Sequence, residues 1–360
     1  MRKPAILFAF ALSVTTGIFS AFRDKEDDSA GLKDYYKKYF PIGVAVSPFD
    51  LTGDNKKLIL TQFNSITSEN AMKMGPIHPL ESTYNWKTAD SVASFARING
   101  LKLRGHCLVW HNQTPKWLFK NDGGERVSKE ILLKRLQTHI NSVVTRYKKG
   151  IYAWDVVNEV IADDSAYFRN SQLYQIAGED FVEMSFRYAH QADPEAELFY
   201  NDYNTEQPTK REKIYRMLKG LLAKGVPIHG IGLQGHWSIN NPSRSELEKS
   251  IALFSSLGLK IQITELDVSV YSGNQGGRLT QGNASGDAEQ FTHEMEEKQL
   301  SQYKMIFEVL RKHKDNITGV TFWNLSDKYS WLDNRGPKNY PLLFDKNLMP
   351  KKAFFEVIKF

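Results

Sequence analysis

The sequence of 360 residues predicts a (β/α)8 barrel, in which eight parallel strands close into one sheet surrounded by helices. First, eight β-rich runs alternate with helical patterns, which is typical of parallel sheets. Second, no GxGxxG or GxxxxGK(S/T) motif follows the first run, so the commonest signature of an open doubly wound sheet is missing. Third, the number of runs is eight, which favours a closed (β/α)8 barrel. We therefore expect one closed barrel rather than an open sheet.

The chain begins with the pattern of a secretory signal over residues 1–21. Arg2 and Lys3 precede an apolar stretch that runs to about Val14, and small residues follow up to Ala21. The alternative is an N-terminal anchor helix, but the stretch is shorter than the ~20 residues that a bilayer span needs. We expect export of a mature chain without a membrane span, to the periplasm, the cell surface or the medium.

Residues 22–38 are predicted to form a charged tether and the start of the first helix, and residues 39–360 the barrel. The β-rich runs of the barrel lie at residues 41–47, 63–70, 101–110, 151–160, 197–204, 228–237, 259–268 and 317–327. Between them, apolar residues recur with a helical period, for example from Ile131 to Tyr147 and in 211–225.

Two further segments carry local signals. Ser245, followed three residues later by Glu248, predicts a helix-capping box, and Gly258 is predicted to end that helix. Residues 271–290 are rich in glycine and polar residues, and we expect them to form a long mobile loop on the site face of the barrel.

The composition excludes several classes of function. Hydrophobic residues make up 41% and charged residues 24%, an ordinary globular mixture that excludes wholesale disorder. The net charge of +6 is scattered rather than concentrated, so we expect no nucleic-acid partner. A single cysteine, Cys107, excludes an intramolecular disulfide and a cysteine-based metal cluster. Aromatic residues reach 12%, and their flat rings suit stacking on a sugar or a base.

Polar side chains gather at the ends of the predicted strands. They are Glu69, Asn70, His106, Trp110, Asn158, Glu159, Asn201, Asp202, Tyr203, Gln234, His236, Glu265, Asp267 and Trp323. In a barrel the C-terminal ends of all strands meet at one mouth, so these side chains are expected to form one site. A single such residue could be a helix cap or a satisfied polar group in the core, but the repeated placement favours a functional site.

Two of these residues, Glu159 and Glu265, end otherwise apolar strands. Paired carboxylates among aromatic walls and amide or imidazole donors fit glycoside hydrolysis, in which one carboxyl donates a proton and the other stays ionised. Burial and mutual repulsion are expected to separate the two titrations. Asn158 and Glu159 are neighbours, so both can face the pocket only if the strand ends or bulges there.

A catalytic metal is the weaker alternative. His106 and His111 stand at i and i+5, which suits neither the HxH of a strand nor the HExxH of a helix. The GxSxG motif of a serine nucleophile is absent. Cys107 points by alternation away from the side of His106, and we expect a buried structural thiol. We therefore expect neither a metal nor a cofactor.

Seven strings lie at or near the predicted strand ends. They are ENAMKM (69–74), GHCLVWHNQTPKW (105–117), WDVVNE (154–159), YNDYN (200–204), GIGLQGHW (230–237), ITELDV (263–268) and WNLSDKYSWL (323–332). Together and in this order they resemble glycoside hydrolase family 10, from about Tyr39 to the C-terminus. The resemblance implies a (β/α)8 barrel, endo-1,4-β-xylanase activity, and xylan and xylo-oligosaccharides as partners.

The resemblance also implies a retaining mechanism with two glutamates. Glu159 of WDVVNE would be the acid/base and Glu265 of ITELDV the nucleophile. Asn158 would hold the 2-hydroxyl of the sugar at the cleavage point. His236 would hydrogen-bond Glu265, with Asp267 orienting its imidazole.

Other residues would bind the substrate. The resemblance implies that they are Glu69, Asn70, Lys73, His106, Trp110, Gln113, Tyr203, Gln234, Trp323 and Trp331. Glu69 and Asn70 would hold the second sugar toward the non-reducing end, and Tyr203 would border the leaving group. Trp323 and Trp331 would crowd the hydroxymethyl group that glucose carries and xylose lacks, which favours xylan over cellulose.

The sequence departs from the common family pattern at three places. Met74 stands where Trp is frequent, Cys107 where Thr is usual, and Asn324-Leu325 where Gly-Val is usual after Trp323. The last change lies near the central sugar and bears on fine specificity.

Two other functions stay open, a related β-glycanase acting on mixed-linkage glucan or aryl-cellobiosides and a non-catalytic xylan-binding barrel. We expect a monomer.

Overall fold

The computed structural model describes residues 30–271, 274–275, 278–279, 291–335 and 337–360. The predicted signal at residues 1–21 lies outside the described residues, and so do most of the charged tether and most of the predicted loop at 271–290. Within the described ranges, no helix combines the length and the apolar character that a membrane crossing requires.

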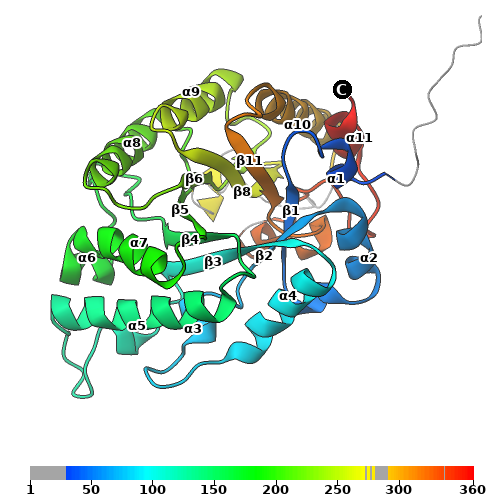
Figure 1. The fold of residues 1–360 in the computed structure, drawn as a ribbon. Helices are drawn as coiled ribbons and strands as arrows, with labels where there is room; N and C mark the ends of the chain where they lie inside the picture. The colour runs from blue at the N-terminus through cyan, green and yellow to red at the C-terminus, as the bar shows by residue number, and fades with distance from the viewer. Residues whose placement is uncertain (1–29, 272–273, 276–277, 280–290, 336) are drawn as a thin grey trace, which may run out of the picture.

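Eight parallel strands close into a barrel at the centre of the molecule, as predicted (Figure 1). They are β1 (Ile42–Val46), β2 (Ser65–Ser68), β3 (Lys102–Trp110), β4 (Ala153–Asn158), β5 (Glu197–Asp202), β6 (Gly230–Leu233), β8 (Lys260–Ser269) and β11 (Ile317–Phe322). Each pairs with the next, and β11 pairs with both β8 and β1, which closes the sheet. Strand β7 (His236–Ser238) adds to the C-terminal part of β8, and β9 (Asn274–Gln275) pairs with β10 (Arg278–Leu279).

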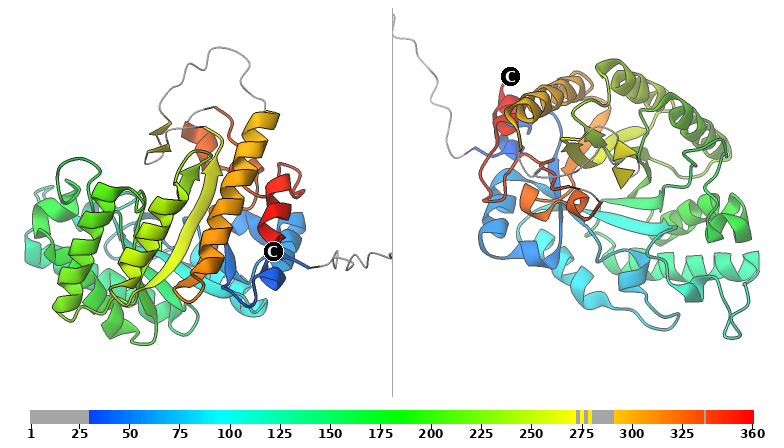
Figure 2. Two further views of the ribbon diagram at one scale, coloured as in Figure 1. Left: turned by 90° about the horizontal axis from the view of Figure 1, so that it is seen from above. Right: turned by 180° about the vertical axis from the view of Figure 1, so that it is seen from behind.

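Helices cover the outside of the barrel, and Figure 2 shows α9 and α10 on either side of β8. The longer helices are α2 (Gly53–Gln62), α4 (Trp86–Ile98), α5 (Lys129–Tyr147), α7 (Asp180–Ala192), α8 (Pro208–Ala223), α9 (Arg244–Ser255) and α10 (His293–Lys312). The shorter ones are α1 (Leu32–Tyr35), α3 (Met74–Ile77), α6 (Gln172–Ala177) and α11 (Lys352–Ile358). Short 3-10 turns follow several strands, among them η2 (Lys116–Leu118), η3 (Asp327–Tyr329) and η4 (Trp331–Arg335).

The core lies between the strands and the apolar faces of these helices. Helix α5 illustrates the rule, because its periodic residues Leu132, Leu136 and Ile140 are fully buried. The hydroxyl of Ser128 caps its N-terminus by accepting a hydrogen bond from the backbone N–H of Ile131. The periodic pattern thus predicted the helix correctly, although Ile131 in its first turn is 46% exposed.

The capping prediction for α9 was also wrong. Ser243, not Ser245, caps this helix, and its hydroxyl accepts from the backbone N–H of Glu246 at 3.3 Å. Helical geometry begins at Arg244, so Ser245 lies inside the first turn, where its side chain cannot reach forward to an unpaired N–H.

The predicted strand at 228–237 is divided in two. Strand β6 ends at Leu233, and β7 begins at His236 after a turn at Gly235 with φ +82°. Glycine is required there twice over, because the backbone is left-handed and a Cβ would lie 2.8 Å from Cγ2 of Ile263. The turn, rather than strand alternation, therefore directs His236 toward the barrel mouth.

Candidate active site

Residues on the C-terminal parts of the barrel strands, or just after them, line one pocket of about 290 Å³. Of the site residues predicted from the sequence, those in its wall are Glu69, Asn70, Lys73, His106, Trp110, Gln113, Asn158, Glu159, Tyr203, Gln234, His236, Glu265, Trp323 and Trp331. Asp267 is fully buried and contacts His236 instead of the pocket. Residues of the wall that had no predicted role are His111, Asn112, Arg169 and Asn204.

The backbone at Glu159 explains how two consecutive side chains reach the pocket. Strand β4 ends at Asn158, and Glu159 adopts a left-handed conformation with φ +58°. Its N–H donates to the backbone oxygen of Asn201 at 2.9 Å, and its carbonyl accepts from Nε of Arg169 at 3.0 Å. These bonds hold a backbone geometry that a regular strand would not allow, so Glu159 follows the strand rather than ending it.

The Glu159 carboxyl is held by two neutral donors. Its Oε2 accepts from Nε1 of Trp110 at 2.8 Å, and its Oε1 accepts from Nε2 of Gln234 at 2.9 Å. Trp110 ends β3 and Gln234 follows β6, so two separate strands fix the carboxyl position. Because neither of these donors is charged, neither bond depends on Glu159 being ionised.

Glu265 has a different environment. It lies on β8, is 4% exposed, and accepts from Nδ2 of Asn201 at 2.8 Å through Oε1. Its Oε2 lies 3.1 Å from Nε2 of His236. Burial alone would raise the pKa of Glu265, but His106, His236 and Lys73 outweigh it and lower the pKa below the usual 4.5. The carboxylate is therefore kept ionised.

His236 lies between two carboxylates. Its Nδ1 is 2.9 Å from Oδ2 of Asp267, and its Nε2 faces Glu265. Burial disfavours the imidazolium, yet the two carboxylates raise the pKa of His236 to about 10. Oδ2 of Asp267 also accepts from Nε1 of Trp331 at 2.7 Å, and the Trp331 ring centroid is 4.7 Å from that of His236. The charged imidazole is thus fixed in orientation and donates to both sides.

A chain of amides connects the two glutamates. Nε2 of Gln234, which donates to Glu159, also lies 3.3 Å from the side-chain amide of Asn158. Nδ2 of Asn201, which donates to Glu265, lies 2.9 Å from the same end of that amide. A shift of either carboxyl would therefore be opposed by the other side of the site.

Asn201 was noted at a strand end but received no role from the sequence. The structure makes it a direct partner of Glu265, and its Oδ1 accepts from the Thr264 hydroxyl at 2.6 Å. Gly232 on the next strand leaves the room for it, because a Cβ there would lie 2.2 Å from Oδ1 of Asn201. The signal that could have found this residue was its place in YNDYN, one position before Asp202.

Sequence reasoning missed a buried ion pair beside the pocket. Arg104 on β3 makes two hydrogen bonds, of 2.7 and 3.1 Å, to the carboxylate of Asp155 on β4. Oδ2 of Asp155 also lies 2.9 Å from Nδ1 of His106. Burial would raise the pKa of Asp155, but Arg104 and His106 lower it, so Asp155 stays charged. The charged residues inside apolar strand patterns were the available signal.

The part of the pocket wall that contains Asn70 and Lys73 consists of polar groups linked by hydrogen bonds. Oδ1 of Asn70 accepts from Nζ of Lys73 at 3.0 Å and from Nε2 of Gln113 at 3.3 Å. The Lys73 ammonium lies 4.9 Å from the ring centroid of Trp110. Burial raises the pKa of Glu69, an effect that Lys73 partly offsets. These groups offer several hydrogen-bonding partners for sugar hydroxyls.

Tyr203 lies in a second charged cluster. Its hydroxyl contacts the carboxylate of Asp163 and accepts from the guanidinium of Arg169 at 2.6 Å. Nζ of Lys210 lies 3.5 Å from the Tyr203 ring centroid and pairs with Asp163 at 2.8 Å and with Asp202 at 2.9 Å. Arg169 therefore supports both Tyr203 and the backbone carbonyl of Glu159.

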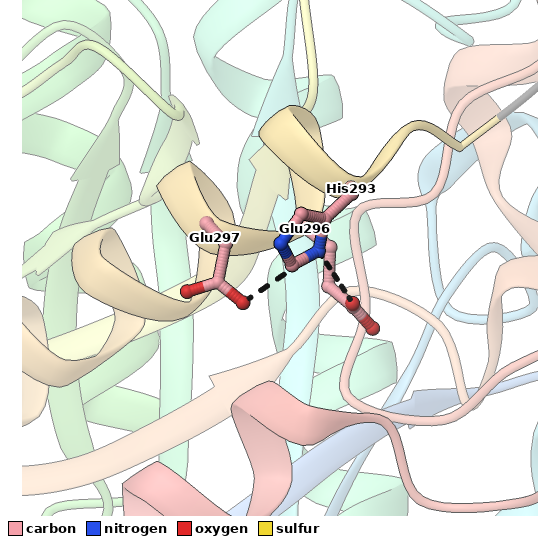
Figure 3. Close-up of side chains that lie close together, drawn as sticks. All are labelled: His293, Glu296 and Glu297. Atoms are coloured by element: carbon pink, nitrogen blue, oxygen red, sulfur yellow. Dashed lines mark ion pairs between the residues drawn. The ribbon is translucent and has the colours of Figure 1, made fainter.

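One group with metal-ligand spacing lies among the described residues, at the start of α10 (Figure 3). It comprises His293, Glu296 and Glu297, whose candidate ligand atoms lie within 4.8 Å of one another. Nδ1 of His293 is 3.9 Å from a carboxylate oxygen of each glutamate, and the His293 side chain is 78% exposed. These contacts are i,i+3 and i,i+4 pairs on a helix surface and are accounted for as ion pairs. None of the three lines the pocket.

Known proteins resemble the chain over nearly its whole length. The sequence profile of glycosyl hydrolase family 10 matches residues 31–360. The β-1,4-xylanase of Dictyoglomus thermophilum is 47% identical over 333 residues, covering 91% of this chain and 90% of that protein. The endo-1,4-β-xylanase B of Paenibacillus barcinonensis is 45% identical over 327 residues, covering 90% and 96%. The crystal structure of xylanase XynB from that organism, complexed with a conduramine derivative, superposes with a TM-score of 0.87 at 44% identity and covers 92% and 99%.

Proposed function

The chain belongs to glycosyl hydrolase family 10, and we propose that it is an endo-1,4-β-xylanase with Glu265 as nucleophile and Glu159 as acid/base. It hydrolyses internal β-1,4 bonds of xylan with retention of configuration. The unequal environments of the two carboxylates carry the assignment of roles. An imidazolium keeps Glu265 ionised, whereas Glu159 is held by two neutral donors.

In the first step, a carboxylate oxygen of Glu265 attacks the anomeric carbon of the sugar at the cleavage point. The bond from that carbon to the leaving oxygen breaks, and Glu159 donates its proton to this oxygen. Asn158 binds the 2-hydroxyl, a contact that strengthens as positive charge develops on the sugar. The product is a glycosyl ester on Glu265, and the released fragment, whose first sugar now carries a free 4-hydroxyl as a new non-reducing end, leaves past Tyr203.

In the second step, Glu159 acts as a base and takes a proton from water. The water oxygen attacks the anomeric carbon, and the ester bond to Glu265 breaks. His236 regains its charge-assisted contact with the released carboxylate, which makes Glu265 a better leaving group. Two inversions give net retention, and the enzyme returns to its starting protonation state.

Export and a monomeric state complete the proposal. The pattern of residues 1–21 supports cleavage near Ala21 and release outside the cytoplasm. N-terminal sequencing of the secreted chain tests the cleavage, and a mature chain that still begins at Met1 would contradict it. Light scattering tests the monomer, and a mass of about twice that of the mature chain, or more, would contradict it.

The names of the relatives favour a xylanase over a glucan-specific enzyme or a non-catalytic binder. The experiment measures hydrolysis of xylan by the wild type, Glu265→Ala and Glu159→Ala. Both variants are expected to lose nearly all activity on xylan. Glu159→Ala should still form the glycosyl-enzyme from aryl-xylobiosides, whose good leaving groups need little acid assistance. Unchanged xylan hydrolysis in either variant would refute the assignment.

A further inference from the structure

Asn324 lies behind the pocket wall, in contact with two of the residues that line it. It follows Trp323 just after β11, is 6% exposed, and has a backbone φ of +98°. Few residues other than glycine adopt this conformation, because a Cβ is strained there. A side chain at such a position must therefore be retained by the contacts that it makes.

Both ends of the Asn324 amide are used. Its Nδ2 donates to Oε2 of Glu69 at 3.2 Å, and its Oδ1 accepts from the backbone N–H of Trp331 at 3.3 Å. Glu69 comes just after β2, whereas Trp331 begins η4. One buried side chain thus connects two pocket-lining residues that come from separate parts of the barrel mouth.

Glu69 and Trp331, the two residues that Asn324 connects, each interact with other groups of the site. Burial raises the pKa of Glu69, and the Asn324 donor is among the groups that oppose this rise. Trp331 packs against His236 and donates to Asp267. The position of the Glu69 carboxylate is therefore coupled through Asn324 to the loop that flanks the nucleophile.

We propose that Asn324 is a positioning residue for the second sugar. It fixes the Glu69 carboxylate, and so sets how much the second sugar contributes to transition-state binding. This inference rests on the proposed function and on the role that the family resemblance implies for Glu69, which is to bind that sugar. An aryl-xyloside places only one sugar in the pocket, whereas an aryl-xylobioside places two. The ratio of their kcat/KM values therefore measures the contribution of the second sugar.

Asn324→Asp isolates the contact with Glu69. The aspartate is nearly isosteric and still accepts from the Trp331 N–H, but it faces Glu69 with a carboxylate in place of a donor. We expect the xylobioside-to-xyloside ratio to fall about tenfold, equivalent to ~1.4 kcal/mol, mainly through KM for the xylobioside. Ser330→Ala is the matched control, because Ser330 caps the N–H of Leu332 in the same loop without contacting Glu69. General damage to the loop or the fold would lower kcat/KM for both substrates by the same factor and leave their ratio unchanged.

The variant Asn324→Gly and the Glu69→Ala background provide two further tests of the same contact. Asn324→Gly removes both contacts and suits the left-handed backbone, so it serves where the aspartate variant fails to fold. In a Glu69→Ala background, Asn324→Asp is expected to cause no further fall in the ratio beyond about twofold.

Three outcomes would overturn the inference. The first is a ratio in Asn324→Asp within about twofold of the wild type while Glu69→Ala lowers it. The second is an undiminished effect of Asn324→Asp in the Glu69→Ala background. The third is an unchanged ratio in Glu69→Ala itself, because Asn324 acts through Glu69. A wild type that hydrolyses neither aryl-glycoside would instead refute the proposed function on which the inference stands.

Discussion

Replacing His236 with asparagine removes the cation that lies between Glu265 and Asp267. The imidazole nitrogens are 3.1 Å and 2.9 Å from the two carboxylates, so each carboxylate loses its nearest charged partner. The pKa of Glu265 is lowered in the wild type, in part by this imidazole. Removal of His236 therefore raises the pKa of the nucleophile.

The size of the rise in the pKa of Glu265 follows from its distance to His236 and from the positively charged groups that stay beside it. An opposite charge within hydrogen-bonding reach lowers a carboxyl pKa by about 1–3 units. His106, at 4.0 Å from Oε1 of Glu265, and Lys73 stay in place, so we expect a rise of about 1–2 units, or ~1.4–2.7 kcal/mol. Since the nucleophile must be ionised, activity in the variant is lost first on the acid side, whereas titration of Glu265 costs little near pH 7.

The assay is kcat/KM for an aryl-xylobioside between about pH 3 and pH 8, which reports the pKa values of the free enzyme. The acid limb of His236→Asn is expected to move upward by about 1–2 pH units. His293→Asn, an exposed histidine outside the pocket, is the matched control and should overlay the wild type. A uniform loss of activity with an unmoved acid limb would refute the electrostatic role of His236.

Three further predictions concern stability and chemistry. Asp155→Asn leaves Arg104 buried without its charged partner, and it should lower the free energy of unfolding by about 3–5 kcal/mol in urea titrations. Asp90→Asn breaks the exposed ion pair with Arg146 and should lower it by less than about 1 kcal/mol. Equal losses in the two variants would contradict this ranking. Cys107 is buried and its thiol pKa is raised, so it should resist thiol reagents until the protein unfolds, and rapid labelling of the native enzyme would show otherwise. Xylan hydrolysis should be the same with and without a chelator, and a loss that added divalent metal restores would contradict the carboxylate mechanism.

The barrel and most of the site could be predicted because their signals are local. Seven of the eight predicted strands have a site residue at or near the end of an apolar run, and the parallel topology brings those ends together. The prediction that Asn158 and Glu159 require the strand to end or bulge also needed only their adjacency. The left-handed turn at Glu159 satisfies that requirement.

The remaining features depend on contacts between segments distant in the chain. The pairing of Arg104 with Asp155 follows from the register of β3 against β4, which no single run of sequence specifies. The link from Asn324 to Glu69 crosses 255 positions and needs the closed barrel. The division of the predicted strand 228–237 followed from Gly235, whose role became visible only beside Ile263.

Trapping of the glycosyl-enzyme tests the central claim most directly. An aryl 2-deoxy-2-fluoro-β-xylobioside slows both steps but keeps a good leaving group, so the covalent intermediate accumulates. Intact-mass analysis should show one added 2-fluoroxylobiosyl group per chain, and peptide mapping should place it on Glu265. Glu265→Ala should remain unmodified. A label on Glu159 or on any other residue, or rapid turnover of the wild type with no covalent species, would contradict the assignment of Glu265 as the nucleophile.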